Sequence, residues 1–255
     1  MQLVDTHCHV QFSDYQLDPD DVLAAAAADG VTKVLCVGCT LKDSQAAIKF
    51  AYGRDNVWAT IGLHPHEAAT YVDDHQALQQ FHDLARKPKV VAIGEVGLDY
   101  YYEHSPRESQ KKMLKFQLDI ATEHKLPVIF HVRDAFEDFW PIFDSYKGLR
   151  GVIHSFTATE VELAQILKRG LYVGINGIVT FSKQQEQLTA AQKVPIDRLL
   201  LETDAPYLTP VPFRGTMCQP KHVRVTAEFL AKLRGERLED LATATTHNAI
   251  DLFNI

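Results

Sequence analysis

The sequence lacks long hydrophobic runs and any excess of positive charge. No apolar stretch approaches the roughly 20 residues of a membrane-spanning helix, and no basic, apolar leader follows Met1, so we predict a cytoplasmic protein without a membrane partner. Lys and Arg number 26 against 33 Asp and Glu, a net charge of −7. This balance excludes a protein that coats DNA non-specifically, because such binding depends on many Lys and Arg contacts to phosphates. It is compatible with an enzyme that brings phosphates to bound metal cations.

Paired cysteines, linkers and repeats are also missing. The four cysteines are scattered, as is usual in a reducing compartment. Cys36 and Cys39 have the CxxC spacing, but no second pair accompanies them, which favours packed thiols over a zinc or redox site. No low-complexity tract interrupts the chain, so we predict one domain over residues 1–255, with no obligatory protein partner.

Short runs rich in Val, Ile and Leu alternate with helical stretches, as expected for parallel strands that are buried on both faces. The runs are Leu3–Thr6, Lys33–Val37, Val57–Leu63, Val90–Gly94, Pro127–His131, Gly151–His154, Leu171–Ile175 and Leu199–Glu202. We therefore predict an α/β fold, a (β/α)8 TIM barrel, regular or distorted, with extra C-terminal helices over 222–235 and 238–253. A doubly wound open sheet is the alternative, but no glycine-rich dinucleotide fingerprint follows the first strand.

Helix boundaries are marked by capping residues. Asp18 precedes a proline and an alanine run, so it is expected to cap a helix that Gly30 ends. Ser105 has capping-box spacing, with proline at the first helical position. Asp134 and Thr159 are expected to cap the next two helices.

The Asp-Thr-His-Cys-His segment at residues 5–9 indicates a metal site. His7 and His9 lie two apart on an extended strand, so both imidazoles face the same way and can bind one transition-metal ion. Other polar residues follow predicted strands: His64, Glu95, His131, His154 and Asp204. All lie at C-terminal strand ends, the face of a barrel where active sites form. Together they predict a metal centre assembled from several strands.

Seven motifs carry a resemblance to the TatD family of metal-dependent hydrolases, which are nucleases of the wider amidohydrolase group. The motifs are DTHCH at 5–9, GLHP at 62–65, GEVGLDYY at 94–101, HVRDA at 131–135, HSF at 154–156, GINGIVTF at 174–181 and ETDAPYL at 202–208. The resemblance implies two divalent ions, Mg²⁺, Mn²⁺ or Zn²⁺. One would be held by His7, His9, Glu95 and Asp204, and the other by a bridging Glu95 with His131 and His154. Such a pair can activate a water and clamp the oxygens of a phosphoryl centre.

Roles follow for the residues around these ligands. Asp204 is expected to take the proton from the attacking water, which makes Asp204, Glu95 and His64 the catalytic candidates. His64, Arg133 and Arg214 are candidates for binding the phosphate, since the planar fork of arginine matches phosphate oxygens. The expected supports are Asp5, Glu202 and Asp99, and the histidines expected at the surface are His66, His75, His82, His124 and His222. Rings that can stack on bases are Tyr100, Tyr101, Phe181, Tyr207 and Phe213.

The resemblance implies a deoxyribonuclease that trims single-stranded 3′ ends, with DNA ends or short nucleic acids as its substrate. The alternative is a D-aminoacyl-tRNA deacylase or a small-molecule ester or amide hydrolase, because a metal hydroxide attacks carbonyl and phosphoryl centres alike. A non-catalytic scaffold is disfavoured, since all six ligand positions are filled. Thr216, Cys218 and Gln219 depart from the family pattern, which carries Lys, Asn and Glu there.

Overall fold

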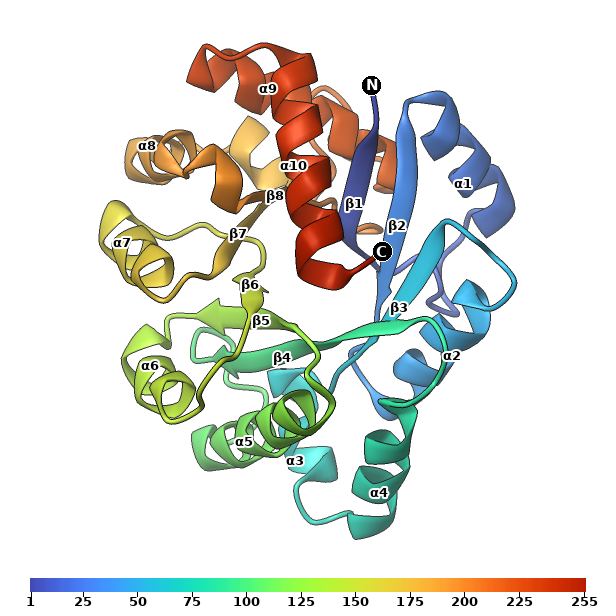
Figure 1. Cartoon of the computed structure of the whole chain (residues 1–255), viewed down its shortest axis with the longest axis vertical. Coiled ribbons are helices and arrows are strands. Elements are labelled where there is room, and N and C mark those ends of the chain that lie inside the picture. The colour runs from blue at the N-terminus through green and yellow to red at the C-terminus, as the bar shows by residue number, and fades with distance from the viewer. The chain divides into compact units, whose positions relative to one another are not determined.

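The computed structural model describes all residues, 1–255. Its eight strands form one sheet in which they follow one another in chain order (Figure 1). The strands are β1 (Leu3–Cys8), β2 (Val31–Val37), β3 (Val57–Ile61), β4 (Val90–Asp99), β5 (Val128–Arg133), β6 (Gly151–Ile153), β7 (Tyr172–Ile175) and β8 (Leu199–Leu201). The prediction of an α/β fold, a (β/α)8 barrel, is confirmed, and the doubly wound alternative is wrong.

Helices separate the strands along the chain. They are α1 (Pro19–Ala28), α2 (Leu41–Ala51), α3 (Ala68–Tyr71), α4 (His75–Leu84), α5 (Arg107–His124), α6 (Phe136–Asp144), α7 (Glu160–Lys168), α8 (Gln185–Lys193), α9 (Val223–Arg234) and α10 (Leu238–Phe253), with 3₁₀ turns η1 (Pro65–Glu67), η2 (Gly177–Thr180), η3 (Ile196–Arg198) and η4 (Pro220–His222). The two predicted C-terminal helices are present as α9 and α10. None of the helices combines the length and apolar composition that crossing a membrane requires.

Two of the four predicted side-chain caps are correct. Asp18 accepts backbone N–H groups of α1, and Thr159 forms a capping box at α7. Ser105 does not cap α5, because its hydroxyl donates to the carbonyl of His66 at 2.6 Å. Asp134 does not cap α6 either, since it adopts a positive φ of 52° and lies outside the cap position.

The chain divides into two compact units. Met1–Cys36 and Ile153–Ile255 form the first, which we call the terminal unit, and Val37–Val152 form the second, the central unit. Each has its own buried apolar side chains, which include Leu3, Leu200 and Phe253 in the terminal unit and Phe81, Phe130 and Phe139 in the central unit. Burial of such side chains is the main driving force that holds each unit together.

In the terminal unit, β1 bonds to the segment that follows β8. The backbone N–H of Asp204 donates to the carbonyl of His7 at 2.8 Å, and that of His9 donates to the carbonyl of Ala205 at 2.6 Å. Helix α10 packs on both strands (Figure 1). Its Asn248 donates to the carbonyl of Leu199, at the start of β8, at 2.9 Å. The carboxyl ends of β1 and β8 therefore lie side by side.

In the central unit, two buried glutamines of α5 fix the ends of β3 and β4. Gln117 accepts the N–H of Leu63 at 2.7 Å and donates to its carbonyl at 3.0 Å. Gln110 makes the same pair of bonds with Asp99, at 2.8 and 3.1 Å. Each glutamine satisfies backbone groups at a strand end, and leaving such buried groups unpaired would cost about 1–3 kcal/mol each. The two glutamines therefore fix the backbone next to His64 and the end of β4.

Candidate metal centre

Three ligand atoms converge in the terminal unit. Nε2 of His7 lies 3.2 Å from Nε2 of His9, and Oδ1 of Asp204 lies 3.5 and 3.2 Å from these two nitrogens. A tetrahedral ion with bonds of about 2.0–2.1 Å separates its ligands by about 3.3 Å. The triangle therefore has the size of one face of a metal site, and both its imidazoles are buried.

Asp204 is ionised in this setting. Burial opposes its charge, but the hydrogen bond from His9 and the nearby imidazoles of His7 and His154 outweigh burial and hold its pKa below the usual range. A carboxylate beside two imidazoles is a donor set that suits Zn²⁺, Mn²⁺ or Fe²⁺. The residues present therefore fit a divalent ion.

Asp5 supports the triangle through the backbone. Its carboxylate accepts the N–H of Thr203 at 2.9 Å, the hydroxyl of Thr203 at 2.6 Å and the N–H of His7 at 3.3 Å. Burial raises the pKa of Asp5 to about 8, although these hydrogen bonds oppose the rise. Asp5 thus joins β1 to the segment that carries Asp204, as expected of a support rather than a ligand.

His154 lies beside the triangle and is oriented by a carboxylate. Its ring stacks on His7 with centroids 3.9 Å apart, and its Nδ1 lies 3.2 Å from Oε1 of Glu202. The same oxygen accepts the N–H of Ser155 at 2.5 Å. Gly174 leaves the space that Glu202 fills, because a Cβ there would meet the carboxylate. With this carboxylate beside Nδ1, Nε2 is the nitrogen of His154 that is available as a ligand.

A second cluster lies in the central unit. Oε1 of Glu95 is 2.8 Å from Nδ1 of His131 and 3.4 Å from Nε2 of His64. Burial lowers the pKa of His64 to about 4, so its ring is neutral and can bind an ion or donate to an anion. The sulfur of Cys39 lies 3.9 Å from Oε2 of Glu95, so this thiol, predicted only to pack, borders the cluster.

Asp99 contacts the ring nitrogen of His131 that Glu95 does not contact. Its Oδ2 lies 2.9 Å from Nε2 of both His131 and His66, and its Oδ1 accepts the N–H groups of Tyr101 and Tyr102 at 3.0 and 2.9 Å. Asp99 is buried, yet these hydrogen bonds hold its pKa far below the usual range. His66, predicted at the surface, is partly buried against Asp99, with 26% of its side chain exposed. The His64-x-His66 spacing, which matches that of His7 and His9, was the signal that could have found it.

Arg133 forms a platform with two tyrosines at the end of β5. Its guanidinium carbon lies 4.1 Å from the ring centre of Tyr101 and 4.8 Å from that of Tyr102. Both rings are more than half exposed. Stacking engages the faces of the guanidinium, whereas its N–H donors lie in the plane and suit phosphate oxygens. We call these three residues the Tyr–Arg platform.

Arg214 lies in the loop that contains Thr216, Cys218 and Gln219, and it bonds to the backbone of that loop. Arg214 donates to the carbonyl of Thr209 at 2.9 Å and lies 4.0 Å over the ring of Phe181. The carbonyl of Thr216 accepts the Thr209 hydroxyl at 2.6 Å, and Cys218 is fully buried. The hydroxyl of Thr216 donates within the loop to the carbonyl of Phe213 at 2.8 Å, and a phosphate contact from Arg214 stays a prediction.

His222 was predicted at the surface, and that prediction is wrong. It is 4% exposed, accepts the N–H of Gln219 at 3.1 Å and stacks on Phe213 with centroids 5.1 Å apart. Burial lowers its pKa to about 4. The neutral ring is thus part of the packing of the loop before α9.

A change from pH 7 to pH 5 is expected to reduce the free energy of unfolding, with His222 contributing about 1–2 kcal/mol of the loss. Its folded pKa lies below its unfolded pKa, so the unfolded state takes up the proton first as the pH falls through about 6.5. Urea unfolding at both pH values measures the loss. His222→Gln should lose less than the wild type, whereas His247→Gln, at an exposed position, should match it. An equal loss in all three proteins contradicts the assignment.

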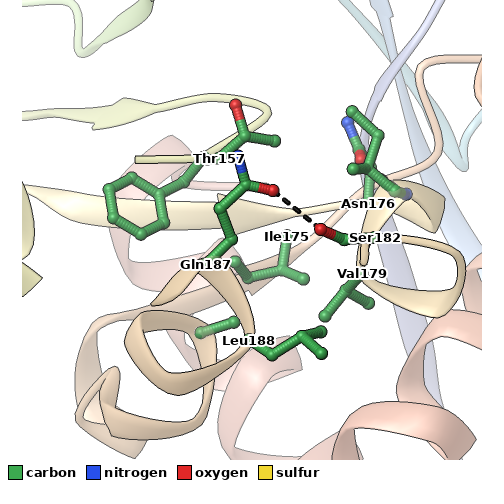
Figure 2. Close-up of a pocket in the computed structure, with 10 residues that line it drawn as sticks. Thr157, Ile175, Asn176, Val179, Ser182, Gln187 and Leu188 are labelled. Carbon is green, nitrogen blue, oxygen red and sulfur yellow. Dashed lines mark hydrogen bonds between the residues drawn. The ribbon is translucent and has the colours of Figure 1, made fainter. Parts of the chain in front are cut away.

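The small cavity in Figure 2 has no part in the metal clusters. It has a volume of about 10 Å³ and is lined by residues of β7, η2 and α8 with their neighbours. Ser182 donates to Oε1 of Gln187 at 2.8 Å across it (Figure 2). A cavity of this size holds a single water at most. It is therefore excluded as a substrate site.

Comparisons with known proteins identify relatives of this chain. The profile of the family described as TatD related DNase matches residues 4–254. The uncharacterized metal-dependent hydrolase YcfH of Escherichia coli K12 is 41% identical over 260 residues, which cover 100% of this chain and 97% of that protein. A 3′-5′ ssDNA/RNA exonuclease TatD of Cronobacter sakazakii is 38% identical over 261 residues, covering 98% and 97%. The solved structure of the TatD homologue YJJV of E. coli K12 matches with a TM-score of 0.90 at 28% identity, covering 99% of this chain and 98% of that one.

Proposed function

Because this chain belongs to the family of TatD-related DNases and is a metal-dependent hydrolase, we propose that it removes nucleotides from the 3′ ends of single-stranded DNA. The triangle of His7, His9 and Asp204 carries this proposal, since its edges match those of a metal site. Relatives from Cronobacter sakazakii and Citrobacter rodentium that are named 3′-5′ ssDNA/RNA exonucleases support the choice of substrate.

The proposed ligands are the six residues that the family resemblance implies. They are His7, His9, His154 and Asp204 of the terminal unit and Glu95 and His131 of the central unit. Divalent ions bound by such residues lower the pKa of a water and neutralise charge on a phosphoryl group. Asp204, which is ionised, accepts the proton of the attacking water in this proposal. The shared role of Glu95 between two ions remains part of the proposal.

The substrate would be gripped by residues of the central unit. His64 is neutral and Arg133 is cationic, so both can donate to phosphate oxygens without competing for the ions. The exposed rings of the Tyr–Arg platform can stack on a base, and such stacking contributes about 1–3 kcal/mol per base with little sequence preference. This combination favours an unpaired strand end over a paired one.

Digestion of end-labelled DNA tests the proposal. With Mg²⁺ or Mn²⁺, a single-stranded oligonucleotide labelled at its 5′ end should shorten one nucleotide at a time. The same oligonucleotide labelled at its 3′ end should lose its label at once, and a fully paired duplex should react more slowly. Glu95→Gln serves as the blank, because the amide keeps the shape of the side chain and loses its charge.

D-aminoacyl-tRNA, RNA and lactones complete the substrate panel. DNA shortening by the wild type but not by Glu95→Gln supports the proposal. Hydrolysis of D-aminoacyl-tRNA or of a lactone without any shortening of DNA overturns it in favour of a carbonyl substrate. Equal DNA shortening by both proteins also overturns it, because the metal ligands would then be irrelevant to the activity.

A further inference from the structure

Two histidines and a glutamate meet where α4 and α5 end, in the central unit. His82 lies in the last turn of α4, and Glu123 and His124 are the last two residues of α5. One ligand atom from each residue lies within 4.8 Å of the other two. We call these residues the helix-end cluster. They share no residue with the clusters around Asp204 and Glu95.

The distances within the helix-end cluster suit a metal ion. Nε2 of His82 lies 3.0 Å from Oε2 of Glu123, and Nε2 of His124 lies 3.6 Å from Oε1 of the same carboxylate. Ligands of a tetrahedral zinc ion are about 3.3 Å apart. One glutamate oxygen and two imidazole nitrogens can therefore reach an ion with small side-chain rotations.

The imidazole of His124 is left unsatisfied by the protein. Its Nε2 is buried and has no hydrogen-bond partner, and its side chain is only 14% exposed. A buried polar atom without a partner costs about 1–3 kcal/mol. A bound ion would supply the missing partner, since the nitrogen faces the Glu123 carboxylate.

The surrounding charges favour a cation. The C-termini of α4 and α5 both end here, and each carries a partial negative charge. Oε2 of Glu123 lies 3.0 Å from Nε2 of His82, and Oδ1 of Asp83 lies 3.8 Å from Nδ1 of the same ring. Arg86 is the one cation in contact, 3.3 Å from Glu123. Its side chain is 67% exposed, so it can move into solvent when an ion binds.

We propose that the helix-end cluster binds a transition-metal dication through His82, His124 and Glu123, and Zn²⁺ is the ion that we propose first. Two histidines and a glutamate form a known zinc ligand set, with water in the remaining position. α5 ends before β5 begins at Val128, whereas His131 lies towards the carboxyl end of that strand. The ion would therefore lie at the opposite end of the strand from His131. Its role would be to tie α4 to α5, and no part of the hydrolytic proposal depends on it.

Counting bound zinc tests this site. The full-length protein is dialysed against buffered Zn²⁺ at pH 7.5, and the metal content per chain is measured for the wild type, His82→Gln and His75→Asn. Glutamine at position 82 can still donate a hydrogen bond to Glu123 but is a poor zinc ligand. His75 is an exposed histidine at the start of the same helix and is the matched control.

We expect the wild type and His75→Asn to retain one more Zn²⁺ per chain than His82→Gln. Zn²⁺ should also raise the Tm of the wild type more than that of His82→Gln, because an ion that binds only the folded state stabilises it. His124→Gln is an independent second variant and should behave like His82→Gln. Equal zinc content in the wild type and both glutamine variants overturns the proposal.

Discussion

Replacing Asp204 by asparagine is expected to lower the rate of DNA hydrolysis by about 10²–10⁴-fold, the effect of losing a general base. The amide has nearly the size of the carboxylate, so the packing of the terminal unit should survive. It cannot accept the proton of the water, and it is a weaker ligand beside the Nε2 atoms of His7 and His9. The measurement is the initial rate of mononucleotide release from single-stranded DNA with Mn²⁺.

Asp197→Asn is the control for this variant. Asp197 belongs to the same unit and is exposed, and the same substitution there should leave the rate unchanged. Circular dichroism of both variants establishes that they are folded. A rate for Asp204→Asn within about threefold of the wild type would remove Asp204 from the proposed chemistry.

Replacing Asp99 by asparagine is expected to weaken Mn²⁺ binding or activity by about 10–100-fold. This is the usual effect of removing a carboxylate that hydrogen-bonds to a metal-binding histidine. Oδ2 of Asp99 lies 2.9 Å from Nε2 of His131, whereas Glu95 contacts Nδ1 of the same ring. Asp99 is a positioning residue, so the loss should appear in the Mn²⁺ concentration needed for half-maximal rate. Excess Mn²⁺ should restore most of the activity.

Asp55→Asn, an exposed aspartate of the same unit, should require no extra Mn²⁺. Asp99→Asn also keeps one oxygen and gains an N–H group, which cannot accept from His131. A drop in activity that excess Mn²⁺ fails to restore would assign Asp99 a different role, because a positioning residue acts through metal affinity. Unchanged Mn²⁺ dependence would contradict the role altogether.

The fold and the clustering of ligands could be predicted because both depend on short-range patterns. Runs of Val, Ile and Leu identify buried parallel strands wherever they occur. The carboxyl ends of such strands share one face, so polar residues like His131 and Asp204 could be assigned to that face without knowing the packing. Asp5 and Glu202 each lie two residues before a proposed ligand, so spacing alone could not distinguish them from ligands, and the contacts of Asp5 with Thr203 identify it as a support.

Side chains in loops and on helices were less predictable, since their partners come from distant parts of the chain. The hydroxyl of Ser105 could cap a helix or bond to the carbonyl of His66, and the local sequence does not show which of the two the tertiary packing selects. Gln110 bonds to Asp99 only because α5 packs against β4 with that face inward. His222 packs against the ring of Phe213 in the folded chain, and no local sequence pattern predicts that contact.

The most direct test of the account is the dependence of hydrolysis on divalent metal. The full-length protein is stripped with a chelator, and mononucleotide release from 3′-labelled single-stranded DNA is followed while Mn²⁺ is added back. The account predicts no release from the stripped wild type, recovery as Mn²⁺ is added, and no recovery in Glu95→Gln. Undiminished release from the stripped protein would contradict the claim that metal ions held by these residues perform the hydrolysis.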